Sequence, residues 1–380
     1  MPPWLRERIL TLLPRVFERY GAATGVPLSF VPTVFMSYGK QERPRSYSYG
    51  GGTLPRVMQL EVRLGSAYAG ERDAEVQERA SLLVAHEAAH FWNAHMFHHE
   101  AKEGDWMHEG GADAFARRAL VGVGEMTPAR LAAIEDEEIG KCLLGAPLGP
   151  IHDAAPVGGR YKLLYWCGTA FARMTELAAA AARPPRDLFA FWGDVFRRAN
   201  GDRYEESTYF DALAALGPGG AAAAETIRAV LADAGADRAK AILDALPDLT
   251  ASPAGAAPSE EYERFAGRVA ATLLLRAPCG RDIALDADKD ALSIVDAPKT
   301  CPAWSGASLV ALEGEPLVRR GAEAWDSATR ACARAGPVDA STRRDGKEPR
   351  VSVACPPRWD PRPSPVHRAV TAPVSAAPKR

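Results

Sequence analysis

The sequence predicts an α+β fold in which a small sheet is followed by a long helical part and then by a second, smaller domain. Segments 28–36 and 57–64 have the composition and alternation of strands. From Asp73 to about Leu246 the apolar spacing is helical. Residues 251–262 have the composition of a linker, and 47% of the chain is hydrophobic, which is sufficient for a real core.

The elements of the first predicted domain, residues 1–250, follow from this spacing. Residues 4–20 carry an apolar stripe despite Pro14, so we expect a helix there. The glycine- and serine-rich stretch 46–53 between the two strands predicts a loop near a cleft. Three later segments are amphipathic and predict helices, namely 187–198, 209–216 and 221–234.

The second predicted domain, residues 263–356, is small and rich in strands. Residues 309–317 predict a strand and a turn, 322–336 a helix, and 351–354 a closing strand. The order of strand, Gly-x-Pro-Leu turn, helix and strand resembles the second half of a PDZ domain over about residues 300–356, and a generic small β-rich domain is the alternative. The proline-rich tail, residues 357–380, predicts disorder.

A metal site is indicated by an H-E-x-x-H motif at His86, Glu87 and His90. Two histidines four residues apart lie on one face of a helix, and both can reach one metal ion. Glu109, in the apolar helical stretch 106–120, can supply the third ligand of a His2Glu zinc site. Glu87 is the expected general base on the water that zinc activates. The alternative is a helix whose histidines are four apart by chance.

Asp113 follows Glu109 by four residues and therefore lies on the same helix face. We expect its carboxylate to accept the outer N–H of His86 or His90 and so to fix the tautomer of that imidazole. An ordinary exposed aspartate is the alternative.

These segments resemble those of the gluzincin zinc metallopeptidases of the aminopeptidase and glycyl aminopeptidase type. Residues 85–93 resemble the H-E-x-x-H-x-W segment of that family, and residues 106–110 resemble its W-L-N-E-G segment, with His108 in the place of the asparagine. The resemblance implies a thermolysin-like catalytic domain with a small sheet lobe and a mainly helical lobe. It also implies one Zn2+ and a peptide or protein substrate.

The same resemblance assigns an oxyanion donor, since the family has a tyrosine in a downstream Y-x-x-G motif. Residues 165–168 have this form, so Tyr165 is the expected donor and Tyr161 the second choice. A tyrosine packed on an amphipathic helix is the alternative.

The chain also departs from this family in two respects. The upstream segment whose glutamate holds a substrate amine is absent: residues 50–54 only loosely resemble its glycine-rich start, and Glu61, on a likely edge strand, is the nearest carboxylate. The 85 residues that precede His86 are too few for the large N-terminal β domain of the family, so we expect either a reduced relative or a sequence that starts downstream of the true start. Aminopeptidase and endopeptidase action both remain open.

The net charge and the cysteine content limit which partners and which cellular compartment fit this chain. The net charge of −2 implies no attraction to nucleic acid, and no apolar run is long enough to span a bilayer. The N-terminus is unlike a secretory signal, which predicts a cytoplasmic protein, or a periplasmic or secreted one if a signal peptide precedes this sequence. Four cysteines of the C-terminal part form either two disulfides or buried thiols, namely Cys279, Cys301, Cys332 and Cys355.

Two functions fit these observations. The first is a zinc-dependent metallopeptidase, and the second is a catalytically silent, zinc-stabilised protein that binds peptides or acts as a scaffold. The retained Glu87 favours the first, because a protein that only binds has no need of a general base. The segment with His95, His98 and His99 lies beside Glu100, Lys102, Glu103 and Asp105, and predicts an exposed loop without a role in the site.

Overall fold

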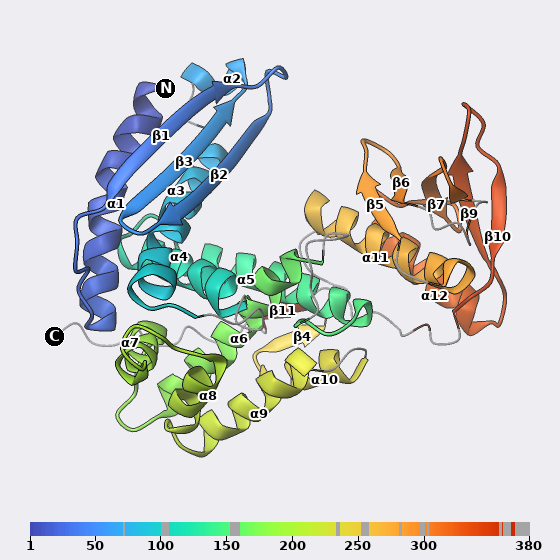
Figure 1. Cartoon of the computed structure of the whole chain (residues 1–380). Helices are drawn as coiled ribbons and strands as arrows, with labels where there is room; N and C mark the ends of the chain where they lie inside the picture. Colours follow the sequence, from blue (N-terminus) through green and yellow to red (C-terminus); the bar gives the residue numbers. More distant parts are fainter. Residues whose placement is uncertain are drawn as a thin grey trace. The chain divides into compact units, whose positions relative to one another are not determined.

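The computed structural model describes residues 1–70, 73–99, 106–152, 160–232, 236–251, 258–280, 283–296, 301, 304–356, 359 and 366–368. The chain divides into two compact units, whose helices and strands are labelled in Figure 1. Unit 1 consists of Met1–Ala132 and Gly168–Ile227, and unit 2 of Ala133–Cys167 and Arg228–Arg380. Both units combine helices with small sheets, which confirms the predicted α+β class.

Unit 1 begins with a helix and a three-stranded sheet. The elements are α1 (Pro3–Thr24), β1 (Thr33–Lys40), β2 (Tyr47–Leu54), β3 (Val57–Leu64), α2 (Ser66–Gly70) and α3 (Ala74–His90). The strand order is β1-β3-β2, with β1 parallel and β2 antiparallel to β3. Helix α3 packs against β2 and β3, and α1 packs against α3 (Figure 1). The side of β3 that faces the helices is apolar, as its buried residues Met58, Leu60, Val62 and Leu64 show.

The stretch 46–53 is mostly a strand, so the predicted loop is wrong. Tyr47 and Tyr49 alternate along β2 and donate hydrogen bonds to Glu75 and to the carbonyl of Val76 on α3. Pairing with β3 satisfies the backbone groups on one edge of the glycine stretch, which composition alone assigns to a turn. The prediction of an edge strand for Glu61 is also wrong, because β3 is the central strand and β2 is an edge.

The rest of unit 1 is helical and is built around a cluster of aromatic rings. Its elements are η1 (Phe91–Met96), η3 (Trp106–Gly110), α4 (Gly111–Gly122), α7 (Leu188–Arg198) and α8 (Glu206–Ala214). Three further helices cross the division between the units: α5 (Pro128–Gly145), α6 (Lys162–Ala181) and α9 (Pro218–Ala232). Within unit 1, the ring centroids of Phe115 and Trp192 are 5.7 Å apart, and those of Trp192 and Tyr209 are 5.3 Å apart. These contacts hold α4, α7 and α8 together.

Unit 2 contains the second sheet. Its elements are η4 (Ala146–Leu148), α10 (Ala236–Ala245), β4 (Leu249–Ala251), α11 (Glu260–Cys279), β5 (Ala284–Ala287), β6 (Leu292–Asp296), β7 (Ser308–Leu312), β8 (Glu315–Pro316), α12 (Gly321–Ala333), β9 (Val338–Arg343), β10 (Arg350–Val353) and β11 (Val366–Arg368). The main sheet has the order β10-β9-β7-β6-β5, with β8 beside β7. Helices α11 and α12 pack on each other and against this sheet.

The predicted strand and turn at 309–317, helix at 322–336 and strand at 351–354 correspond to β7 with β8, α12 and β10. The sequence analysis missed α11, which begins at the N-cap Ser259 and buries its apolar face. The PDZ resemblance and the domain boundaries stay predictions. Residues 252–257 of the predicted linker, and residues 357–358, 360–365 and 369–380 of the predicted tail, lie outside the described residues.

All six cysteines of the chain are paired in disulfides, and all three disulfides belong to unit 2. The pairs are Cys142–Cys167, Cys279–Cys301 and Cys332–Cys355. The sequence left disulfides and buried thiols open for the last four of these cysteines, and the structure has disulfides. The pair Cys142–Cys167 was not anticipated.

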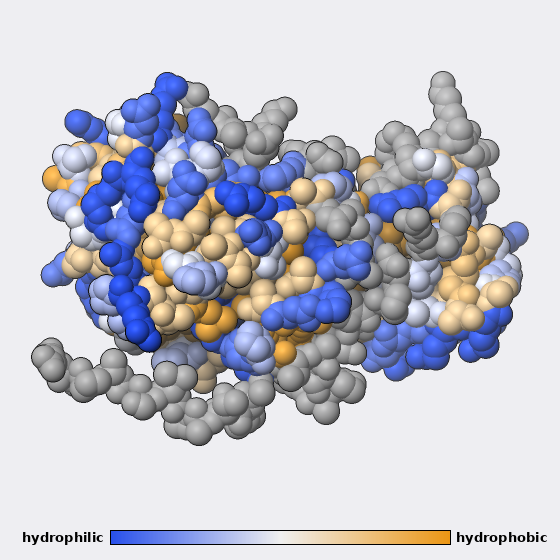
Figure 2. Space-filling model, turned by 90° about the horizontal axis from the view of Figure 1, so that it is seen from below, coloured by the Kyte–Doolittle hydropathy of each residue, from blue (hydrophilic) through white to orange (hydrophobic). Residues whose placement is uncertain are grey.

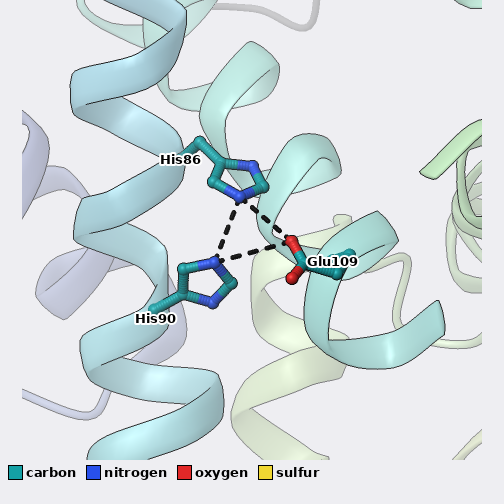
Figure 3. A group of neighbouring side chains, drawn as sticks. All are labelled: His86, His90 and Glu109. Carbon is teal, nitrogen blue, oxygen red and sulfur yellow. Dashed lines mark hydrogen bonds and ion pairs between the residues drawn. The ribbon is translucent and has the colours of Figure 1, made fainter. Parts of the chain in front are cut away.

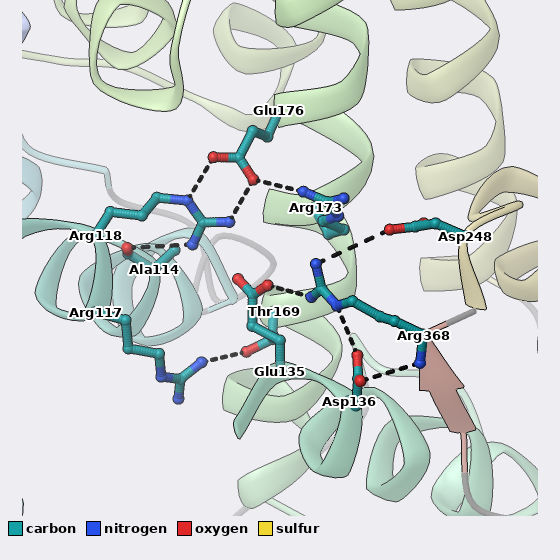
Figure 4. Close-up of polar contacts among 10 residues, drawn as sticks. All are labelled: Ala114, Arg117, Arg118, Glu135, Asp136, Thr169, Arg173, Glu176, Asp248 and Arg368. Atoms are coloured by element: carbon teal, nitrogen blue, oxygen red, sulfur yellow. Dashed lines mark hydrogen bonds and ion pairs between the residues drawn. The ribbon is translucent and has the colours of Figure 1, made fainter. Parts of the chain in front are cut away.

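The strand β11 brings a basic side chain to acidic partners within unit 2. It pairs antiparallel with β4, and Arg368 donates hydrogen bonds to Glu135 at 2.6 Å and to Asp136 at 2.9 Å (Figure 4). The Glu135 side chain is only 1% exposed, so Arg368 provides the countercharge for a buried carboxylate. Residues 366–368 therefore stabilise unit 2 by both backbone and side-chain bonds.

The surface mixes hydrophilic and hydrophobic side chains on the face seen in Figure 2. Among the residues that the structure describes, no helix is both long enough and apolar enough to cross a membrane.

Candidate metal centre

Helix α3 and the segment η3 bring three potential metal ligands together in unit 1. The side chains of His86 and His90 project from one face of α3, and Glu109 reaches them from η3 (Figure 3). The Nε2 atoms of the two histidines are 3.1 Å apart. The Oε2 atom of Glu109 is 3.3 Å from His86 Nε2 and 3.8 Å from His90 Nε2. The three predicted ligands thus form one cluster.

The helix that carries both histidines is well anchored. Asp73 caps its N-terminus by accepting from the backbone amides of Glu75 and Val76. At the other end, the buried Tyr20 of α1 donates to the carbonyl of Ala85 at 2.8 Å. These bonds place α3 before any metal binds, which is what a preorganised site requires.

The Nδ1 atom of each histidine has a partner of its own. His86 Nδ1 lies 2.7 Å from the Oδ1 atom of Asp113, which is the contact expected for that residue. His90 Nδ1 lies 3.1 Å from the side-chain oxygen of Asn93, a residue that the sequence analysis did not single out. Both Nε2 atoms are consequently directed at Glu109. Two imidazole nitrogens and a carboxylate oxygen are a donor set that zinc accepts, so these residues fit that ion.

Asp113 is in turn held by Arg117, one turn later on α4. Arg117 donates to Asp113 Oδ2 at 2.8 Å and to the Thr169 hydroxyl at 2.8 Å. Burial opposes ionisation of Asp113, but the charge of Arg117 and the bond to His86 keep the pKa of this carboxyl below its usual value. Asp113 therefore stays a charged acceptor opposite His86.

The cluster itself shifts the pKa values of its members. Burial lowers the pKa of His86, but hydrogen bonds to Asp113 and Glu109 overcome this effect and raise it to about 10. Burial and the neighbouring His86 lower the pKa of His90. Burial alone would raise the pKa of Glu109, but the bond to His86 and the adjacent imidazoles hold it well below its usual range. In the absence of metal, a proton on His86 thus balances the carboxylates.

Glu87 lies beside the cluster, buried against the sheet. Its exposed fraction is 6%. A Cβ added at Gly51 of β2 would lie only 2.5 Å from the Glu87 Oε1 atom, so the absence of a side chain at Gly51 makes room for this carboxyl. Burial raises the pKa of Glu87 to about 7, although the adjacent His86 acts in the opposite direction. A carboxyl with this pKa can both take up and release a proton near neutral pH.

The glycine of the Y-x-x-G motif packs directly behind Glu109. A Cβ added at Gly168 of α6 would lie 2.5 Å from the Cα atom of Gly110, so both glycines allow α6 and η3 to approach closely. Tyr165 precedes Gly168 on α6 but belongs to unit 2, where its ring is 5.6 Å from that of Tyr161. The role of Tyr165 stays a prediction.

The histidines around the cluster are less exposed than the sequence indicated. The His108 ring lies 4.2 Å from that of His90 and 5.4 Å from that of His99, and burial lowers the pKa of His108 to about 4. His95 falls within η1, so the predicted exposed loop is wrong for it: the helix continues past His90 as a wider turn. Residues 100–105 lie outside the described part of the chain.

Comparisons with known proteins find a likeness of fold. No protein-family model matches the chain, and no curated protein matches it by sequence. A similar solved structure is that of an aminopeptidase N family protein from Idiomarina loihiensis, with a TM-score of 0.58 and 14% sequence identity. The match covers 96% of this chain and 64% of that one, so the chain spans about two thirds of its neighbour. This likeness supports an aminopeptidase-like α+β fold.

Proposed function

We propose that the protein is a zinc-dependent metallopeptidase that hydrolyses peptide bonds. The observation that carries this proposal is the convergence of His86, His90 and Glu109 with Glu87 buried beside them. The resemblance of the two motifs to gluzincin segments and the fold of the structural neighbour support the same class of reaction.

The histidine and glutamate ligands would hold one zinc ion through two Nε2 atoms and a carboxylate oxygen. When bound, zinc supplies Lewis acidity, which polarises the scissile carbonyl and makes water a stronger acid.

Glu87 is the proposed general base and acid. Its carboxylate takes one proton from the attacking water and returns it to the nitrogen of the leaving amine, so the proton count closes over the cycle. The pKa of Glu87, raised to about 7 by burial, suits both steps. Asp113 and Arg117 keep His86 oriented while this proton moves.

Strand β2 is the proposed seat of the substrate backbone. Among the described residues it pairs with β3 alone, so its other edge has no strand partner and is the edge with which we propose that an extended peptide pairs. Because Gly51 of this strand packs against Glu87, a peptide paired with β2 would bring its backbone to the general base. Main-chain pairing of this kind favours peptides over other substrates with a hydrolysable carbonyl.

Tyr165 is the proposed donor to the oxyanion, by resemblance to the Y-x-x-G motif. A phenol O–H directed at the carbonyl oxygen stabilises negative charge that develops only in the transition state. The close packing of Gly168 behind Glu109 supports this proposal, since Gly168 belongs to the same motif.

The three disulfides support an oxidising compartment, so we place the enzyme in the periplasm or outside the cell rather than in the cytoplasm.

The decisive variant is Glu87→Gln, which keeps the size of the side chain but cannot accept a proton. We expect it to retain one zinc per chain and to lose peptide hydrolysis. Zinc without hydrolysis in both the unchanged chain and the variant would instead favour the alternative, a zinc-stabilised protein that binds peptides or acts as a scaffold.

A further inference from the structure

A single buried amide links one proposed ligand to the segment that carries another. Asn93 lies in η1, three residues after His90, and is only 1% exposed. Its side-chain oxygen is 3.1 Å from His90 Nδ1. Its side-chain nitrogen donates to the carbonyls of Met107 and His108, at 3.2 and 2.8 Å. These two residues directly precede Glu109 in η3.

The two carbonyls fix which way the amide of Asn93 faces. A backbone carbonyl oxygen can only accept, so the group opposite Met107 and His108 must be the NH2 of Asn93. The oxygen of the amide must then face His90 Nδ1 and accept its proton. Rotating the amide by half a turn would set three oxygens against one another, which is strongly unfavourable in a buried place.

This orientation determines the tautomer of His90. With the proton held on Nδ1, a neutral imidazole carries its lone pair on Nε2. That Nε2 atom is the one directed at His86 and Glu109. The ring of His108 packs on the His90 ring at 4.2 Å, so the imidazole is held at its face as well as at its edge.

The geometry points to Asn93 as a positioning residue for the metal. The Asn93 oxygen holds the His90 imidazole with its lone pair on Nε2. The Asn93 nitrogen binds the backbone just before Glu109 and so sets the separation between the ligands on α3 and η3. The inference rests on the proposed zinc site and concerns this chain's own residues. A partner that orients a ligand in this way typically changes metal affinity by roughly ten- to one-hundred-fold when it is removed.

The test compares three variants with the unchanged full-length chain. Asn93→Leu removes both functions of the amide at similar size. Asn93→Asp keeps an oxygen opposite His90, and its other oxygen can donate to the two carbonyls only when the buried carboxyl is protonated. Tyr204→Phe is the matched control, because it removes a hydrogen bond to the backbone of Asn93 and not to its side-chain amide. The Tyr204 hydroxyl donates to the backbone carbonyl of Asn93 at 2.8 Å. The readouts are zinc affinity by competition with a chelator, and the His90 tautomer by 15N NMR of the metal-free chain.

We expect Asn93→Leu to bind zinc roughly ten- to one-hundred-fold more weakly and to lose the fixed Nδ1–H tautomer. Tyr204→Phe should keep both properties, and Asn93→Asp should keep the tautomer. The inference is overturned if Asn93→Leu retains the affinity and the tautomer, if Asn93→Asp folds but loses the tautomer, or if Tyr204→Phe weakens zinc as much as Asn93→Leu. If the unchanged chain binds no zinc, the proposed metal site fails, and this inference fails with it.

Discussion

Gly51 offers a sharp test of where the general base lies. The substitution Gly51→Ala adds one methyl group to β2 at a point where it would meet the Glu87 side chain. The neighbouring glycines provide matched controls, because a Cβ at Gly50 or at Gly52 has no atom within 4 Å. All three substitutions make the same chemical change in one strand, so only the contact with Glu87 distinguishes them.

The size of the effect follows from the distances. The added carbon would lie 2.5 Å from Glu87 Oε1 and 2.6 Å from both Cδ and Cγ. An ordinary carbon contact is about 3.5 Å, so the carboxyl must retreat by about 1 Å. Because Cγ is also too close, rotation of the carboxylate alone does not relieve the contact. A misplacement of about 1 Å costs about 100-fold in rate, or about 2.7 kcal/mol of transition-state stabilisation.

The assay is kcat/KM on a peptide that the unchanged chain cleaves, with zinc content measured on the same samples. We expect Gly51→Ala to lose about 100-fold in kcat/KM with its zinc retained, while the variants at Gly50 and Gly52 stay within about threefold. Equal activity in all three variants would show that Glu87 is not the group that moves the proton, or that β2 does not pack on it during catalysis.

Four further predictions concern the metal site, the metal-free fold and unit 2. Asp113→Asn should weaken zinc roughly ten- to one-hundred-fold in a chelator competition, because the charged acceptor of His86 is lost; an unchanged affinity would contradict its role. At about pH 8, zinc binding should release close to one proton, because the pKa of His86 is raised to about 10 without metal and a ligand nitrogen must be deprotonated. Calorimetry in buffers of different ionisation enthalpy measures this release, and a release of zero would contradict the prediction. The raised pKa of His86 also makes the stability of the metal-free fold depend on pH. The folded chain keeps a proton on His86 that the unfolded chain releases above its pKa of about 6.5, so the urea midpoint should fall as pH rises from about 6.5 to about 10. Arg368→Met should destabilise the protein by about 3 kcal/mol in urea unfolding, because the ion pairs to the buried Glu135 and to Asp136 are lost; a loss below about 1 kcal/mol would mean that these ion pairs contribute little to stability.

Much of the fold follows from local patterns, and the exceptions have tertiary causes. The apolar stripe of residues 4–20 and the alternation of residues 57–64 predict α1 and β3, since burial on one face imposes those periods. The glycines of β2 defeat such patterns, and one of them, Gly51, makes room for Glu87 of α3, which local sequence does not record. Helix α11 was missed although it buries an apolar face, because its first turn falls in the predicted linker and the segment after it was assigned to a domain rich in strands.

The ligand cluster was accessible from sequence because metal chemistry dictates residue types at fixed spacing. His86 and His90 are one turn apart, and Asp113 is one turn beyond Glu109, so each pair shares a helix face. Asn93 had only a weak signal, a lone amide in the apolar run Phe91-Trp92-Asn93. Its partners are backbone carbonyls, which no side-chain motif encodes.

The proposed activity is tested most directly by mass-spectrometric mapping of cuts in a mixed peptide library, with the zinc-loaded chain and its Glu87→Gln variant in parallel. We predict cuts by the unchanged chain that disappear in the variant while zinc remains bound, and the distance of those cuts from the amino terminus will separate aminopeptidase from endopeptidase action. Zinc-loaded chain that makes no cut, or cuts that persist in Glu87→Gln, would contradict the proposal that Glu87 drives peptide hydrolysis in this protein.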